Sequence, residues 1–163
     1  MRKLLTLLIP MAFPLLVCCQ TKLDKVLERM NEESVPYVTV DQAIQSREAI
    51  FLDTREANEF EISHIGNALW VGYDHFDMEK VTNTILEKET PIIVYCSIGV
   101  RSEDIGEQLM KAGYTNVKNL YGGIFEWKNQ EQPVFRDTVE TQEVHAYNRI
   151  WGRFLKKGKK VYQ

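Results

Sequence analysis

The chain has 163 residues, with 20 lysines and arginines against 23 aspartates and glutamates, and a formal net charge of −3. Its composition, 44% hydrophobic and 26% charged, is that of a folded globular protein and excludes disorder throughout. A chain of this length supports one domain with appendages. The slightly negative charge and the lack of aromatic–basic RNA-binding motifs give no reason to expect nucleic acid as a partner.

The first 18 residues have the features of a bacterial export signal. A basic start at residues 1–3 leads into an apolar run, Leu4 to Val17, which is too short for an ordinary membrane-spanning helix. Pro10 and Pro14 would also interrupt such a helix. We therefore expect residues 1–18 to be a signal peptide that is removed when the protein is exported to the cell envelope.

Leu16-Val17-Cys18-Cys19 stands at the end of this run. It resembles the signal box of bacterial lipoproteins, in which a peptidase cuts before a cysteine that is then acylated. The resemblance implies that Cys19 is lipidated and anchors the protein to a membrane, facing the periplasm. Cys18 stands where a smaller residue is usual, so acylation of Cys18 and an unlipidated product remain alternatives. Acylation of Cys19 would leave Cys96 as the single thiol of the mature chain, without a disulfide partner.

Residues 19–35 are predicted to form a tether, with a helix over 22–33. The helix is indicated by apolar residues at helical spacing, namely Leu23, Val26, Leu27 and Met30. Pro36 ends this helix, and a short strand is expected over 37–40. A brief helix, capped by Asp41, is expected to follow the strand.

Ala49 to Asp53 is an apolar run that ends in a polar residue, as expected of a buried parallel strand with a functional carboxyl end. Asp53 and Arg55 form either an ion pair that braces the loop, which we favour, or part of the catalytic machinery. A helical turn is expected over 56–62. His64 is expected to brace the next loop through a hydrogen bond rather than to act as a base.

The segment Pro91–Ser102, PIIVYCSIGVRS, places a cysteine between a strand and a helix. The apolar residues 92–95 predict a strand that is buried on both faces, and a helical pattern starts at Ser102. Cys96 therefore lies at the carboxyl end of a strand, which is where a parallel sheet binds its ligand.

The surroundings of Cys96 favour a thiolate. A free cysteine has a pKa of roughly 8.5, which a helix N-terminus and a nearby guanidinium can lower to about 3.5 to 7.5. Arg101 supplies the guanidinium, and Gly99 allows the N–H groups of the loop to point at the sulfur as an anion nest. The alternative is an inert buried thiol, and Arg101 together with Gly99 favours a chemical role over it.

Strands and helices alternate along the rest of the chain. A strand is expected over 68–71 and an amphipathic helix over 76–87, whose candidate core contacts are Phe76, Val81, Ile85 and Leu86. The helix after Cys96 is expected to end near Gly113, before a last strand over 117–120. The alternation predicts an α/β fold with a parallel sheet and helices on both faces.

Three ordered motifs carry a resemblance to a known family. They are the cysteine-to-arginine loop, the upstream segment LDTREANEFEISHIGNA (52–68), and Tyr121-Gly122-Gly123 followed by Trp127. Together they resemble the rhodanese-like (sulfurtransferase) family over about residues 36–133. The resemblance implies a single rhodanese-like domain there.

The resemblance also implies a mechanism in which Cys96 takes a sulfane sulfur from a small-molecule or protein donor and passes the sulfur from its persulfide to a thiol or cyanide acceptor. The implied substrate-binding residues are Ser97, Ile98, Gly99, Val100, Arg101 and Ser102, and Asp53 and Arg55 support the loop. Ser97 and the apolar Ile98 and Val100 depart from members with extra positive charge in the loop, which weakens the expectation of thiosulfate as donor. No cofactor is implied, and the sequence has no Walker loop, dinucleotide fingerprint or Cys/His metal spacing.

Two other functions remain open. A phosphatase or arsenate reductase uses the same loop architecture with one more residue between cysteine and arginine, and a non-catalytic module would only dock partners. The shorter loop opposes the first, because it encloses a volume suited to one sulfur atom rather than a phosphoryl group. The intact Cys96 and Arg101 oppose the second.

Residues 134–163 form a basic extension outside the resemblance. A roughly helical period is shown by Val144, Tyr147, Trp151, Phe154 and Leu155, and no acidic residue follows Glu143. We expect an amphipathic helix packed on the domain with a solvated basic end. The alternative is that this segment lies on anionic lipid.

Overall fold

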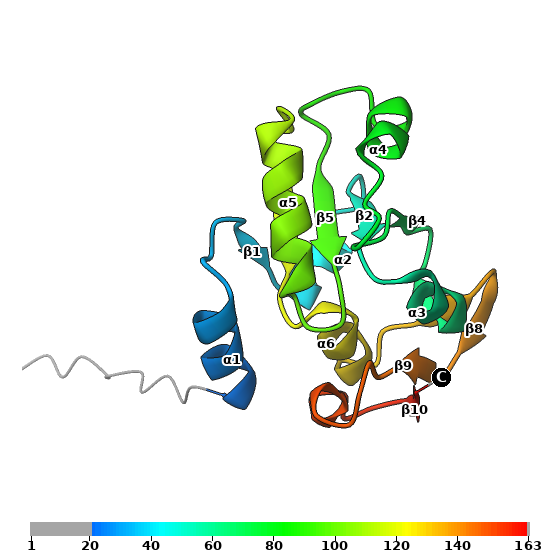
Figure 1. Cartoon of the computed structure of the whole chain (residues 1–163). Helices are drawn as coiled ribbons and strands as arrows, with labels where there is room; N and C mark the ends of the chain where they lie inside the picture. Colours follow the sequence, from blue (N-terminus) through cyan, green and yellow to red (C-terminus); the bar gives the residue numbers. More distant parts are fainter. Residues whose placement is uncertain (1–20, 163) are drawn as a thin grey trace, which may run out of the picture.

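The computed structural model describes residues 21–162, so the expected export signal (1–18) and Cys19 lie outside the described residues. Figure 1 shows the arrangement of the elements, which follow one another along the chain as α1 (Lys22–Met30), β1 (Tyr37–Val38), α2 (Val40–Gln45), β2 (Ile50–Asp53), α3 (Ala57–Ile62), β3 (His64–Ile65), β4 (Leu69–Trp70), α4 (Met78–Thr84), β5 (Ile92–Tyr95), α5 (Arg101–Lys111), β6 (Val117–Leu120), α6 (Gly123–Asn129), β7 (Val134–Arg136), β8 (Val139–Thr141), β9 (Glu143–His145), the 3₁₀ turn η1 (Trp151–Arg153) and β10 (Lys159–Val161).

The central sheet has five strands in the order β1-β6-β5-β2-β4, and every pair is parallel. β5 lies in the middle, and all its residues are buried, as the apolar run predicts. In the register of β2 and β5, Asp53 lies opposite Tyr95. The carboxyl ends of these strands therefore meet at one edge, directly before Cys96.

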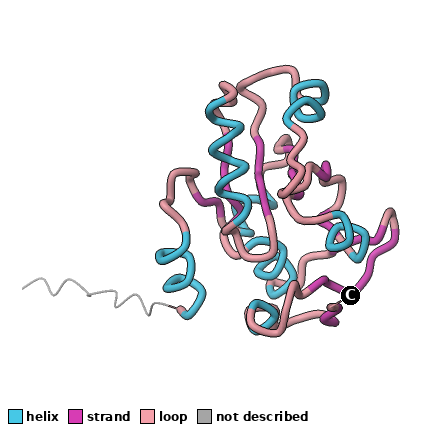
Figure 2. The backbone as a smooth tube through the Cα atoms, viewed as in Figure 1, coloured by secondary structure: helices cyan, strands magenta, loops and turns pink. Residues whose placement is uncertain are grey.

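The two faces of the sheet are covered by different helices, and the side chains of β5 alternate between them. Ile93 and Tyr95 pack in one apolar cluster with residues of α2 and α6, whereas Ile92 and Val94 pack in a second cluster with residues of α4 and α5. Figure 2 shows the strands flanked by these helices. The predicted parallel α/β sheet with helices on both faces is confirmed.

Several element boundaries differ from the predicted ones. α1 ends at Met30 rather than at residue 33. The first strand ends at Val38 because the Thr39 hydroxyl accepts the Gln42 N–H and caps α2, so the assignment of Asp41 as cap is wrong. α5 begins at Arg101, one residue before the predicted start.

The helix predicted over 76–87 is shorter in the structure. The carboxylate of Asp77 accepts the Lys80 N–H at 2.9 Å and starts α4 at Met78, and the helix ends at Thr84. Val81 and Ile85 are buried as expected, but Leu86 is 74% exposed, so its assignment to the core is wrong.

The segment 134–163 does not form the predicted helix. Tyr147 has a positive φ of 59°, and the Asn148 carboxamide accepts the N–H groups of Ile150 and Trp151, so this part of the chain turns instead. β7 pairs with β3 and β8, and β9 pairs with β10.

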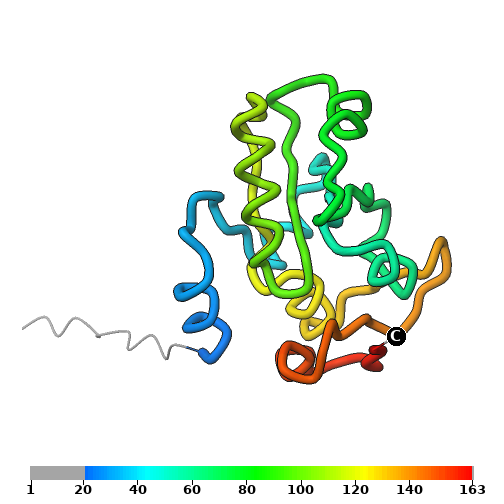
Figure 3. The backbone as a smooth tube through the Cα atoms, viewed as in Figure 1, coloured from blue at the N-terminus to red at the C-terminus, as the bar shows by residue number. Residues whose placement is uncertain are grey.

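The extension nevertheless belongs to the core. Val144, Ala146 and Leu155 are fully buried and join the apolar cluster that contains Phe125 of α6. In Figure 3 the segment, coloured orange to red, passes below the yellow α6. Within residues 21–162, none of the helices combines the length and the apolar character that crossing a bilayer requires.

We predict that Leu155→Ala lowers the free energy of unfolding by about 2 to 5 kcal/mol, because it removes a fully buried side chain. Ile150→Ala is the matched control in the same segment. Ile150 is 62% exposed, and its loss should cost ~0.5 kcal/mol or less. Urea unfolding followed by circular dichroism measures both. Equal, small losses would contradict a core role for this segment.

Candidate active site

Cys96 opens a tight loop between β5 and α5. The thiol is 1% exposed, and the Gly99 N–H donates to its Sγ at 3.2 Å. Gly99 reaches this position with φ +104°, and a Cβ there would lie 3.3 Å from the Leu120 carbonyl oxygen. Glycine is therefore needed to turn the backbone N–H toward the sulfur.

The carbonyl oxygen of Gly99 accepts hydrogen bonds from two amide side chains. Asn31, at the C-terminus of α1, and Asn119, in β6, each donate to it at 2.8 Å. The Asn119 carboxamide oxygen accepts the Ser102 hydroxyl at 2.8 Å, so Ser102 serves as an internal tie rather than as a helix cap. Sequence reasoning missed both asparagines because they are distant from the loop along the chain and have no motif of their own.

The N-terminus of α6 donates hydrogen bonds to the first two residues of the same loop. The Ile124 N–H donates to the Cys96 carbonyl at 2.9 Å, and the Phe125 N–H donates to the Ser97 carbonyl at 3.1 Å. A Cβ on Gly123 would lie 2.3 Å from the Cys96 carbonyl oxygen. The Tyr121-Gly122-Gly123 motif thus lets a helix begin against the backbone of the loop.

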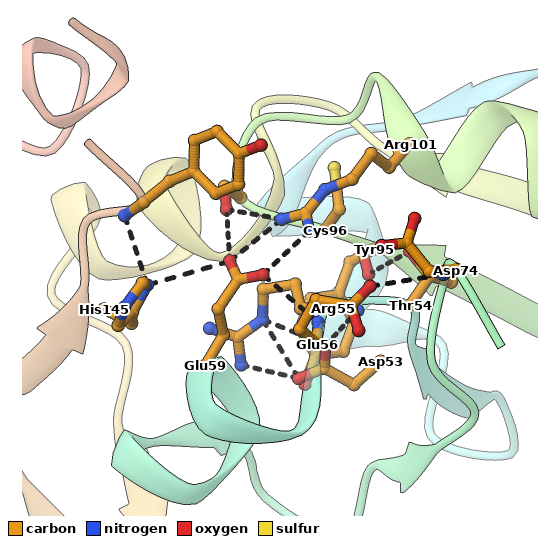
Figure 4. Close-up of polar contacts among 12 residues, drawn as sticks. Asp53, Thr54, Arg55, Glu56, Glu59, Asp74, Tyr95, Cys96, Arg101 and His145 are labelled. Atoms are coloured by element: carbon orange, nitrogen blue, oxygen red, sulfur yellow. Dashed lines mark hydrogen bonds and ion pairs between the residues drawn. The ribbon is translucent and has the colours of Figure 1, made fainter. Parts of the chain in front are cut away.

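Arg101 is bound by Glu59, a residue that sequence reasoning did not select. Its guanidinium donates to the two carboxylate oxygens at 2.7 and 2.9 Å, and the Ser97 hydroxyl donates to the same carboxylate at 3.1 Å. Burial raises the pKa of Glu59, but the bonded Arg101 outweighs burial and holds the pKa below its ordinary value. Figure 4 shows Glu59 extending from α3 to Arg101 beside Cys96.

Burial also raises the pKa of the Cys96 thiol. The charge of Arg101 and hydrogen bonds from the backbone N–H groups of Ser102 and Gly99 more than offset it, so the pKa lies below its ordinary value. A buried thiol with a lowered pKa is suited to act as a nucleophile.

Asp53 and Arg55 form a separate ion pair at 2.6 Å, with both side chains fully buried. Arg55 also donates to the Ser63 carbonyl at 2.6 Å, which ties the start of α3 to its end. Figure 4 shows this pair near Glu59, consistent with the favoured interpretation of a brace. His64 also makes a bracing contact, because its Nδ1 lies 3.2 Å from the Phe60 carbonyl oxygen.

His145 was not expected near the site, because the three histidines are scattered along the sequence. The fold places its Nδ1 3.9 Å from the Glu59 carboxylate. The Tyr147 N–H donates to the same nitrogen at 3.2 Å. No group of side chains suited to hold a metal ion is found among residues 21–162.

A cavity of about 160 Å³ opens above Cys96. Its walls come from the loop, from α1 and from the C-terminal segment, and the lining residues are Met30, Cys96, Ser97, Ile98, Val100, Arg101, Tyr147 and Trp151. All the predicted loop residues except Gly99 and Ser102 therefore line it, and those two position the loop.

The sequence profile of the rhodanese-like domain matches residues 37–130, which is more than half of the chain. The chain belongs to the rhodanese-like domain family. This assignment agrees with the three motifs, because Glu59 of the upstream segment and the N-terminus of α6 both bond the Cys96 loop.

Known proteins agree with this assignment. Thiosulfate sulfurtransferase GlpE of Coxiella burnetii is 29% identical over 101 residues, which cover 61% of this chain and 90% of that protein. A tRNA uridine(34) hydroxylase of Erwinia tasmaniensis is 35% identical over 91 residues, or 54% of this chain and 26% of that protein. The crystal structure of a thiosulfate sulfurtransferase from Pseudomonas aeruginosa superposes with a TM-score of 0.59 at 20% identity, covering 80% of this chain and 25% of that one, and shows the shared fold.

We predict that Arg101→Ala raises the pKa of Cys96 above its wild-type value, because the nearby positive charge that lowers it is lost. Glu59→Gln should lower the pKa of Cys96 below its wild-type value, because the substitution leaves the charge of Arg101 uncompensated. The pH dependence of alkylation, followed by mass spectrometry of the Cys96 peptide, measures both. Arg149→Ala, at an exposed site, is the control. An unchanged pKa in Arg101→Ala would contradict the electrostatic role of Arg101.

Proposed function

We propose that this protein is a sulfurtransferase that carries sulfane sulfur as a persulfide on Cys96. The observation that carries the proposal is the buried Cys96 thiol, whose sulfur accepts the Gly99 N–H and whose pKa is lowered by Arg101. The sulfurtransferase name of the Coxiella relative supports the same reaction class.

In the proposed first step, the Cys96 thiolate attacks the sulfane sulfur of the donor. A bond forms between Sγ and that sulfur, and the bond to the rest of the donor breaks, so that the leaving group departs with the electron pair. In the second step, an acceptor thiolate or cyanide attacks the outer sulfur and releases the Cys96 thiolate. The loop N–H groups stabilise the negative charge on sulfur in both steps.

The loop geometry favours this reaction over phosphoryl transfer. Four residues, 97–100, separate Cys96 from Arg101. The loop is tied at both ends, by α6 at Cys96 and by Asn119 at Gly99 and Ser102. A phosphoryl group would need more N–H groups around a larger opening.

Cys96→Ser is expected to abolish thiocyanate formation from a sulfane donor and cyanide, because serine cannot hold the transferred sulfur. The variant should keep the circular dichroism spectrum of the wild type. Arg149→Ala, at an exposed residue of the domain, is the control, and its turnover should equal that of the wild type. Thiocyanate formation by Cys96→Ser at a rate comparable to the wild type would contradict the proposal. The proposal would also be contradicted if the wild-type protein hydrolysed aryl phosphates and transferred sulfur from no sulfane donor.

We further propose that the protein is exported and held at a membrane by acyl chains on Cys19. The signal features of residues 1–18 and the Leu16-Val17-Cys18-Cys19 box support this proposal. An anchored protein would present its domain to donors and acceptors of the cell envelope.

Metabolic labelling with a fatty-acid probe tests the anchor. We expect label on the wild type and on Cys96→Ser, and none on Cys19→Ala. Label retained by Cys19→Ala would show that Cys19 is not the acceptor. Recovery of the full-length protein in the cytosolic fraction would contradict export.

A further inference from the structure

We propose that the cavity above Cys96 selects an organic sulfane donor that carries an apolar or aromatic group over the inorganic thiosulfate dianion. This inference rests on the proposed sulfurtransferase function and specifies its substrate. Two features of the site carry it: the apolar wall of the cavity, and the engagement of its cation by other side chains.

Five of the seven residues that line the cavity around Cys96 have apolar or aromatic side chains. Ile98 and Val100 contribute from the loop, and Met30, Tyr147 and Trp151 contribute from α1 and the C-terminal segment. A dry apolar cavity of roughly 150 Å³ binds benzene, and this one measures about 160 Å³. The cavity thus has room for one aromatic ring or a short alkyl group beside the sulfur.

Three of these wall residues lie outside the segment that matches the family profile, 37–130. Met30 is the last residue of α1, and the next residue, Asn31, donates to the Gly99 carbonyl. Tyr147 and Trp151 follow β9, whose Val144 is fully buried in the core. The wall is therefore attached to the loop and to the core, and it belongs to the site itself.

Arg101 is the cation of the cavity lining, and both of its terminal nitrogens already bind protein side chains. One terminal nitrogen binds Glu59 at 2.7 Å, and the other binds Glu59 at 2.9 Å and the Ser97 hydroxyl at 3.2 Å. The ring of Tyr147 covers the guanidinium, with 5.0 Å between the ring centroid and the guanidinium carbon.

The charges of Arg101, Glu59 and a Cys96 thiolate sum to −1. A dianion would approach this net negative charge at a guanidinium whose positive charge is already compensated by the Glu59 carboxylate. An organic donor carries less charge and buries its apolar group against the wall. The smaller charge and the buried apolar group therefore both favour the organic donor.

An aryl thiosulfonate illustrates the chemistry. The Cys96 thiolate attacks its terminal sulfur, a sulfur–sulfur bond forms, and the bond between that sulfur and the sulfonyl sulfur breaks. The aryl sulfinate leaves with the electron pair. Two monoanions give two monoanions, the enzyme persulfide and the sulfinate, so no proton, oxidant or reductant is needed.

The test compares benzenethiosulfonate with thiosulfate as donors to cyanide, using the full-length protein. We expect kcat/KM for benzenethiosulfonate to exceed that for thiosulfate by ~10-fold or more after correction for the intrinsic reactivity of each donor, measured with a small thiol in solution. A corrected ratio at or below one would overturn the inference while leaving the proposed function standing. Failure of both donors would overturn the two together.

Substitutions of wall residues test whether the apolar wall causes the preference for the organic donor. Met30→Ala and Trp151→Ala should each lower kcat/KM for benzenethiosulfonate by ~10-fold and change thiosulfate turnover little. Met30 is 48% exposed, so its replacement does not endanger the fold. Ile150→Ala, at an exposed apolar residue next to Trp151, is the control and should leave both donors unchanged. Equal losses for both donors in Met30→Ala would overturn the role of the wall.

A charge variant tests the second feature. Met30→Lys places a free ammonium at the rim of the cavity and should raise thiosulfate kcat/KM while lowering that for benzenethiosulfonate, which narrows the ratio of the two by ~10-fold. A ratio unchanged from the wild type would show that charge at the cavity does not decide between the donors.

Discussion

The bidentate contact between Arg101 and Glu59 sets the properties of this site. It joins the first residue of α5 to α3, and it places a compensated cation beside the buried Cys96. Charge-assisted bidentate pairs are strong and directional, and a buried pair is costly to break on one side only. The pair therefore fixes the direction of Arg101 and limits how much of its charge a ligand can use.

The rest of the loop is held by backbone groups and amides. α6 donates to the carbonyls of Cys96 and Ser97, while Asn31 and Asn119 hold the carbonyl of Gly99. With its carbonyls bonded outward, the loop presents an N–H group to the sulfur. This preorganisation stabilises a charged sulfur without rearrangement at the moment of reaction.

The segments on either side of the family-matched region contribute directly to the site. α1 ends where Asn31 meets the active loop, and the chain after residue 133 returns to wall the cavity with Tyr147 and Trp151. Neither segment is a free appendage, because Leu27 and Val144 are buried. A loop of the family-matched region is thereby combined with a cavity wall that comes partly from residues outside that region.

Much of this arrangement could be predicted from local patterns. The apolar run 92–95, the loop glycine and the alternation of elements are short-range signals, and they predicted the sheet, its central strand and the place of Cys96. Glu59 could not be found in the same way, because it meets Arg101 only through the packing of α3 against the loop. The helical period after residue 143 was misleading, since burial of Val144 and Leu155 in the core can arise from strands and turns as well as from a helix.

The central claim is that Cys96 carries sulfur. The most direct measurement is mass spectrometry of the Cys96 peptide after the protein is incubated with a sulfane donor and quenched with an alkylating agent. The account predicts a peptide that is heavier by one sulfur atom and returns to its original mass after treatment with cyanide. A Cys96 peptide that stays unmodified with thiosulfate, with an aryl thiosulfonate and with an organic persulfide would contradict the account.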